Sequence, residues 1–111
     1  MSSKQAKAHH SVYVIELDEK ICNKKRFKQQ NPGYQPGQAC LYVGMTGRNP
    51  ETRFQQHLAG YKASRSVKNF GVRLRHELFA RLNPMPYDQA CKKEVSLAET
   101  LRDMGYGVIQ A

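Results

Sequence analysis

The segment Ser11–Leu17, with the sequence SVYVIEL, constrains the fold more than any other part of the chain. β-branched and aromatic residues dominate it, and such residues pack well on the pleated surface of a sheet. A second short segment, Cys40–Gly44 (CLYVG), has the same character. The two segments predict a pair of buried strands that run antiparallel.

The stretch between these strands, residues 18–39, is long and basic. It holds five cations and then two turn signals, which are Lys20, Lys24, Lys25, Arg26, Lys28, Asn31-Pro32-Gly33 and Gln35-Pro36-Gly37. We expect an enlarged basic hairpin insertion that adds no element to the core. Residues 1–10 carry no apolar run. We expect them to be a disordered lead-in to one domain over residues 11–111.

Helix signals follow the second strand. Asn49, Pro50 and Glu51 supply a capping side chain, a proline at the first helical position and an acid in the first turn. Phe54 and Leu58 lie four residues apart and predict the apolar face of this helix. Gly60 ends it.

Further elements are expected along the rest of the chain. They are a helix over Ser64–Phe70, a strand near the end of Val72–Leu82, a long helix capped by Asp88 and ending at Gly105, and a candidate short strand at Val108–Ile109. The sequence therefore predicts an α/β (α+β) fold, with a small, mainly antiparallel, three-stranded sheet flanked by helices.

Charge and cysteine content narrow the functional classes. Lys and Arg total 18 against 9 Asp and Glu, a formal net charge of +9, which favours a polyanionic partner such as DNA, RNA or an anionic membrane surface. No run approaches the roughly 18 apolar residues of a membrane span, and no secretory signal follows Met1. We therefore expect a cytoplasmic protein without a membrane partner. Three cysteines, Cys22, Cys40 and Cys91, without a C-x-x-C pair, argue against a disulfide framework and a structural zinc site.

Two helical patterns carry candidate chemistry. Arg53 and His57 lie four residues apart and share one helix face, distinct from that of Phe54 and Leu58, although an ordinary exposed polar face gives the same spacing. On the long helix, Glu94 falls within an apolar stripe, whereas Glu99 falls on the opposite face. The stripe consists of Ala90, Leu97, Ala98, Leu101 and Met104.

A carboxylate on the core side of a helix is costly unless it is paired or binds a metal ion. The alternative for Glu94 is a position at the edge of the stripe, from which it reaches water. The strand tyrosines Tyr13 and Tyr42 are typical of a core with the hydroxyl groups hydrogen-bonded. Tyr42-Val43-Gly44 also indicates that another group closely approaches the backbone at the glycine.

The order of these features resembles the GIY-YIG nuclease family. The matching segments are Ser11-Val12-Tyr13, Tyr42-Val43-Gly44, Thr52–His57 with Arg53, and the helix with Glu94 followed by Leu97, Ala98 and Leu101. The resemblance covers Ser11 to Ala111. The chain departs from the family at Ser11, which replaces a glycine, and at Met45, where repair members often have a lysine. An asparagine common near the family's C-terminus is missing; Gly107 or Ala111 stands there.

The resemblance implies a metal-dependent endonuclease acting on DNA or, alternatively, RNA. It implies that Glu94 holds Mg²⁺ (or Mn²⁺), that Arg53 grips the scissile phosphate, and that Tyr42 and His57 bind phosphate or relay protons. Tyr13 would act as the general base or position the water. Its ordinary pKa of about 10 is too high for a base unless a nearby cation lowers it.

The resemblance also implies a positively charged surface. We expect the five site residues to converge on one concave face. Cations that would track the nucleic-acid backbone without reading sequence are Arg48, Lys62, Arg65, Lys68, Arg73 and Arg75. A homodimer or a partner protein would then supply specificity.

Two alternatives remain open. The first is a non-catalytic nucleic-acid-binding domain that kept the fold and lost the site, which Met45 and the missing asparagine favour. The second is an interaction module whose charge serves solubility. Metal-dependent cleavage separates the nuclease from both alternatives, and salt-dependent DNA binding separates the second alternative from the first.

Overall fold

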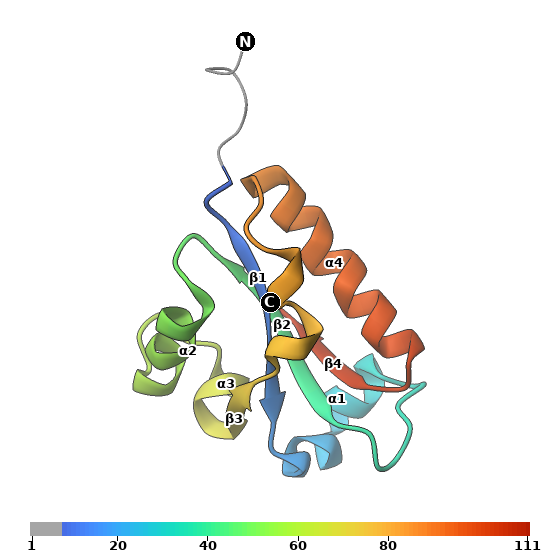
Figure 1. Cartoon of the computed structure of the whole chain (residues 1–111). Helices are drawn as coiled ribbons and strands as arrows, with labels where there is room; N and C mark the ends of the chain where they lie inside the picture. Colours follow the sequence, from blue (N-terminus) through green and yellow to red (C-terminus); the bar gives the residue numbers. More distant parts are fainter. Residues whose placement is uncertain (1–7) are drawn as a thin grey trace.

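The computed structural model describes residues 8–111 and shows a small α/β fold built on a mixed sheet (Figure 1). The sheet order is β3-β1-β2-β4. β1 pairs antiparallel with β2 and β3, whereas β4 runs parallel to β2. The strands are β1 (Ser11–Leu17), β2 (Cys40–Thr46), β3 (Gly71–Leu74) and β4 (Gly107–Gln110).

The expectation of a three-stranded sheet is therefore corrected to four strands, with the candidate strand at Val108–Ile109 confirmed as part of β4. A parallel neighbour needs a long crossover connection. The helices and turns between β2 and β4 provide it. They are α2 (Pro50–Ala59), α3 (Arg65–Phe70), η3 (His76–Leu78), η4 (Ala80–Leu82) and α4 (Tyr87–Asp103).

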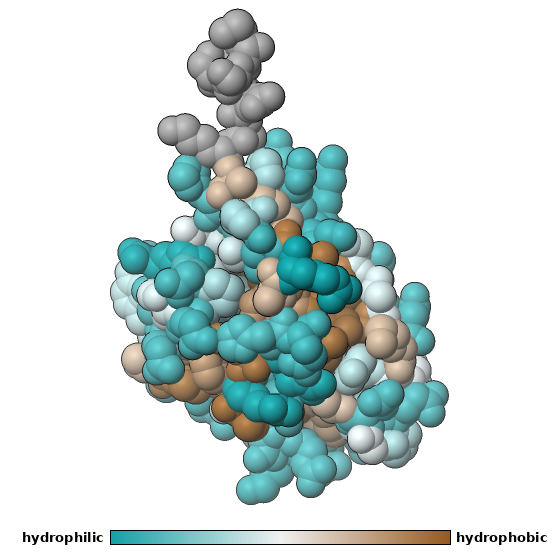
Figure 2. Space-filling model, viewed as in Figure 1, coloured by the Kyte–Doolittle hydropathy of each residue, from teal (hydrophilic) through white to brown (hydrophobic). Residues whose placement is uncertain are grey.

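The helices cover both faces of the sheet. Figure 1 shows α2 and α3 on one side of the strands and α4 along the other. The central strands are buried on both faces, since Val12, Val14, Ile15 and Val43 are each 0% exposed. Hydrophilic side chains cover most of the outer surface in the same view, with apolar patches between them (Figure 2).

The predicted start and end of α2 are confirmed. The Asn49 side chain accepts a hydrogen bond of 2.7 Å from the backbone N–H of Thr52, and Pro50 occupies the first turn. Gly60 ends the helix with a φ of 87°, a left-handed conformation that glycine adopts without steric cost.

The predicted apolar face of α2 is wrong in one position. Leu58 is 39% exposed, whereas His57 is 1% exposed and lies on the buried side with Phe54. Residues three apart share a helix face as readily as residues four apart. The buried face of α2 therefore contains an imidazole, and Arg53 and His57 do not share a solvent-exposed face.

The ends of α4 and the position of β3 also differ from expectation. Pro86 occupies the N-cap of α4, so Asp88 lies in the first turn. Met104 follows the last helical residue and is 55% exposed, although Ala90, Ala98 and Leu101 are buried as predicted. Gly105 has a φ of 96°, which confirms the prediction that this glycine ends the helix.

β3 covers the start of the stretch Val72–Leu82, not its end as predicted. It follows α3 without a break and pairs with β1 through Ile15 and Leu74. The remainder of the stretch forms the two short turns η3 and η4. After Leu74, the backbone N–H of Arg75 donates to the Val14 carbonyl oxygen at 2.9 Å, and the Asn83 side chain bonds the backbone of Val12.

The basic insertion over residues 18–39, hereafter the excursion, is part of the core, contrary to the prediction. It forms η2 (Glu19–Asn23) and α1 (Lys25–Gln30), and buries Ile21 and Phe27. The Phe27 ring packs directly over Gly107 of β4. A disulfide joins Cys22 to Cys40, so the expectation of no disulfide is corrected as well. The two turn signals fold the excursion back and bring these distant cysteines together.

The expected disordered lead-in lies mostly outside the described residues. At its described end, His10 forms an antiparallel bridge with Met85, through backbone hydrogen bonds of 2.9 and 2.8 Å. The ordered domain therefore includes at least His10. No helix within residues 8–111 is both long and apolar enough to cross a membrane.

Candidate active site

Two tyrosines project from the same face of the sheet. Tyr13 pairs with Gly44 across β1 and β2, and Tyr42 pairs with Ile15, so alternation points both rings toward α2. Their ring centroids are 6.2 Å apart. A Cβ atom on Gly44 would lie 2.6 Å from the Tyr13 hydroxyl oxygen. The predicted close approach to this glycine is therefore confirmed, and the approaching group is Tyr13.

His57 of α2 holds the Tyr13 hydroxyl. Its Nε2 lies 2.9 Å from the Tyr13 hydroxyl oxygen, and its Nδ1 accepts a 3.1 Å hydrogen bond from the backbone N–H of Ser64. A backbone N–H only donates, so Nδ1 carries a lone pair and the ring proton sits on Nε2. His57 therefore donates to Tyr13, which leaves the tyrosine's own proton free for another acceptor.

Burial keeps these rings uncharged. It lowers the pKa of His57 to about 4, and the Arg53 cation adds to the effect. It also raises the pKa of both Tyr13 and Tyr42, and Arg53 only partly opposes this rise. The Arg53 cation lowers the pKa of Tyr13 as expected, but desolvation outweighs it and the net pKa is raised. A raised pKa keeps the hydroxyl groups protonated, so they can donate hydrogen bonds.

Arg53 lies beside the rings and braces the turn that follows α2. Its Nη1 and Nη2 donate hydrogen bonds of 3.2 and 2.8 Å to the carbonyl oxygens of Tyr61 and Lys62. Nη1 also donates to the Gln56 side chain at 3.3 Å. A guanidinium has five N–H donors, so these three contacts leave others for a ligand.

Glu94 of α4 lies close enough to both tyrosines for its charge to act on them. Its carboxylate is half-buried and raises the pKa of both Tyr13 and Tyr42, as a neighbouring negative charge does. Burial raises the pKa of Glu94 itself, opposed by a 3.2 Å hydrogen bond that Gln110 Nε2 donates to Oε1. Glu99 is exposed, as predicted from the helix periodicity.

The sequence did not predict two groups that hydrogen-bond to the candidate site residues His57 and Glu94. The Ser64 backbone fixes the His57 tautomer, which no sequence pattern reveals. Gln110 donates to Glu94 from the last residue of β4. Its signal was an amide side chain close to the position where the family's asparagine was sought.

The metal expected at Glu94 would have one protein ligand. No group of three or more His, Cys, Asp or Glu side chains able to hold an ion gathers within residues 8–111. A half-buried carboxylate with a raised pKa fits a cation, whose charge offsets the cost of ionising the carboxylate. Mg²⁺ suits this setting, because it retains waters and takes phosphate oxygens as further ligands.

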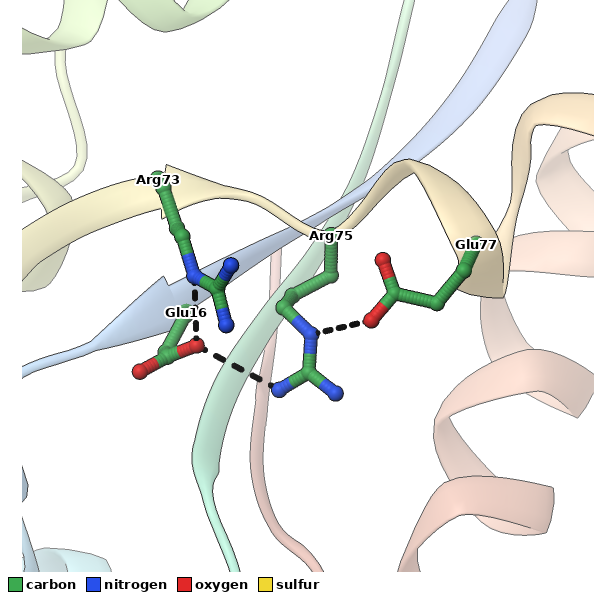
Figure 3. A network of polar contacts seen from close by, with 4 residues as sticks. All are labelled: Glu16, Arg73, Arg75 and Glu77. Carbon is green, nitrogen blue, oxygen red and sulfur yellow. Dashed lines mark hydrogen bonds and ion pairs between the residues drawn. The ribbon is translucent and has the colours of Figure 1, made fainter.

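The predicted backbone-tracking cations divide into two groups. Arg48, Lys62, Arg65 and Lys68 are exposed around α2 and α3. Arg73 and Arg75 instead join an ion-pair network with Glu16 and Glu77 (Figure 3).

Pairing affects the two arginines of the network differently. Arg75 is 15% exposed and contacts Glu16 at 3.3 Å and Glu77 at 2.6 Å, so it is withdrawn from the predicted nucleic-acid surface. Arg73 is 64% exposed and has one surface ion pair of 3.0 Å with Glu16, a weak interaction that a phosphate can replace.

The chain was also compared with known proteins. No protein-family model, curated protein or solved structure matches it.

Proposed function

We propose that the protein is a divalent-metal-dependent endonuclease that hydrolyses phosphodiester bonds in DNA by GIY-YIG-type chemistry. The observation that carries this proposal is the 2.9 Å contact between the Tyr13 hydroxyl and His57, in a cluster with Tyr42, Arg53 and Glu94. Hydrolysis needs a positioned water and stabilisation of charge on the phosphate and the leaving oxygen. The cluster supplies groups for each task.

Tyr13 positions the attacking water in this proposal. His57 Nε2–H occupies one lone pair of the Tyr13 oxygen and fixes its orientation. The tyrosine's proton is then directed to the water or to a phosphate oxygen. Its raised pKa favours a hydroxyl that donates a hydrogen bond over the general-base alternative.

Arg53 binds the scissile phosphate. Its contacts with two carbonyl oxygens hold the guanidinium plane in place before substrate arrives. Preorganised donors stabilise developing charge without a reorganisation cost at the moment of reaction. Tyr42 adds a second hydroxyl donor beside Tyr13.

Glu94 would hold one Mg²⁺ or Mn²⁺, with Gln110 orienting the carboxylate. When bound, the ion supplies positive charge that stabilises the transition state and the leaving oxygen. DNA is the proposed substrate and RNA the alternative. We further propose that a second copy or a partner protein supplies specificity.

A non-catalytic nucleic-acid-binding domain is the second candidate function. Met45 favours it, since it is half-buried and brings no charge to the end of β2. The Cys22–Cys40 disulfide does not favour the cytoplasmic location that we expected, because the cytosol keeps thiols reduced. A cytoplasmic location stays a proposal.

The proposed activity predicts metal-dependent nicking of labelled branched, nicked or single-stranded DNA, which a chelator stops. Tyr13→Phe should lower the cleavage rate by about a hundredfold, because the donor to the water is lost. Tyr87→Phe is the matched control, since Tyr87 is 56% exposed at the start of α4, and it should cleave normally. DNA binding without cleavage, for every combination of substrate and metal tested, would favour the second candidate.

A further inference from the structure

A cleft of about 620 Å³ lies between α1, α3 and β4. Three cations line it: Lys24, Arg26 and Arg65. No carboxylate is among its lining residues that the structure describes. Its size falls within the range of small-ligand pockets, and its charge favours an anion.

The cleft adjoins the candidate active site at two points. Ile109, which lines it, pairs with Tyr42 across β4 and β2, so these two side chains project side by side from one face. Gln110, which also lines it, donates to Glu94. A strand whose phosphate lies at the tyrosine cluster would therefore place a neighbouring nucleotide at the cleft.

Covalent and backbone links hold the walls of the cleft together. The Asp18 backbone N–H donates a 2.7 Å hydrogen bond to the carbonyl oxygen of Phe70, which ties the start of the excursion to the end of α3. The Cys22–Cys40 disulfide ties η2 to β2. The cleft is thus formed before any ligand binds.

The lining combines three chemistries that a single unpaired nucleotide requires. Lys24 Nζ lies 5.7 Å from the centroid of the half-buried Phe70 ring, so a cation and an aromatic face lie within reach of one nucleotide. Aromatic rings stack on unpaired bases and cations contact the phosphate. The amides of Gln30 and Asn69 can hydrogen-bond to base edges. A base inside a duplex is already stacked and paired, and cannot enter.

We propose that this cleft binds an unpaired nucleotide of DNA next to the scissile phosphate, which makes strands at single-strand junctions the substrate class. The proposal rests on the proposed function for the position of the scissile phosphate. The binding of unpaired DNA itself can be measured without cleavage.

The test is fluorescence anisotropy with a labelled single-stranded oligonucleotide and a blunt duplex of the same sequence, with a chelator present. Phe70→Leu keeps an apolar side chain but removes the stacking surface. It should weaken single-strand binding by about tenfold and leave duplex binding within about twofold. Lys24→Gln should likewise weaken single-strand binding more than duplex binding. Lys92→Gln, an exposed lysine of α4 outside the cleft, is the charge-matched control and should affect both equally.

Equal losses for the two ligands in both cleft variants, or no loss in either, would overturn the proposal. Lys24→Gln decides the outcome if Phe70→Leu fails to fold, which its thermal unfolding would show. The cleavage assay is independent of this binding test. If the protein cleaves DNA with metal but binds single strands no better than duplex, the proposed activity stands and the proposed role of the cleft fails. If it does not cleave, but Phe70→Leu abolishes its preference for single strands, the role of the cleft stands and the proposed activity fails.

Discussion

The position of the Tyr13 hydroxyl depends on two neighbouring residues, Gly44 and His57. Gly44 opposes Tyr13 in the sheet and provides no Cβ, while His57 provides one N–H. Tyr13 is 2% exposed, so its ring has no free space to move into when either neighbour is substituted. The position of the hydroxyl is thus set by Gly44 and His57.

Gly44→Ala should destabilise the protein by roughly 1–3 kcal/mol and greatly reduce cleavage, because overpacking would displace the Tyr13 ring. A Cβ atom there would meet the Tyr13 hydroxyl oxygen at 2.6 Å. Gly33→Ala is the control, since nothing lies within 4 Å of its Cβ position. Urea unfolding of both variants measures the difference, and equal stability of the two would contradict this account of Gly44.

His57 predicts a defined pH dependence of stability. Its pKa falls from 6.5 to about 4 on folding, so between these values the unfolded chain binds a proton that the folded chain does not. The free energy of unfolding should therefore decrease as the pH falls from about 6.5 to about 4. His57→Gln, which cannot titrate, should show a shallower decrease in urea unfolding over this range. The same slope in both proteins would argue against a neutral, buried His57.

For individual residues, the sequence predicted which side chains lie near one another better than it predicted how they are packed and paired. The proximity of Tyr13 and Tyr42 was predicted, and their ring centroids lie 6.2 Å apart. The burial of His57 and the paired state of Arg75 were not predicted, because both depend on which elements pack beside them. Tertiary packing, and not local pattern, decides both properties.

Among the elements, α2 and the excursion illustrate what local sequence can determine. The ends of α2 follow from short-range capping chemistry, so Asn49, Pro50 and Gly60 predicted them. The core role of η2 and α1 arises from contacts with β2 and β4, far along the chain. The disulfide and the parallel pairing of β4 are likewise long-range events, which an unaligned sequence does not encode in any local window.

The disulfide should stabilise the excursion and the cleft that it borders. Its cysteines are separated by 18 positions, and closing a loop of similar length stabilises a fold by about 3 kcal/mol. Cys22→Ala should therefore lower the free energy of unfolding by about that amount under non-reducing conditions. Cys91→Ala removes a free, half-buried cysteine and should have a much smaller effect. A native protein whose urea midpoint is unchanged by reductant would contradict a stabilising role.

Across the whole molecule, charge is unevenly paired. Within residues 8–111 the ion pairs are formed by Arg73 and Arg75, on β3 and directly after it, and His76 hydrogen-bonds to Glu51. The cations around α1, α2 and α3 have no carboxylate partner in this region, and the chain carries a formal net charge of +9. Three of these cations, Lys24, Arg26 and Arg65, line the cleft, and clustered unpaired cations are the electrostatic footprint of a nucleic-acid-binding surface.

The central claim is that this surface surrounds a hydrolytic site anchored by Glu94. Its most direct test compares Glu94→Gln with Glu99→Gln, two isosteric changes on the same helix, in a Mg²⁺-dependent DNA cleavage assay with folding checked by circular dichroism. We predict that Glu94→Gln lowers cleavage about a hundredfold or more while DNA binding persists. Glu99→Gln, at an exposed position, should cleave like the native protein. Cleavage retained in Glu94→Gln, or lost in Glu99→Gln alone, would contradict the claim.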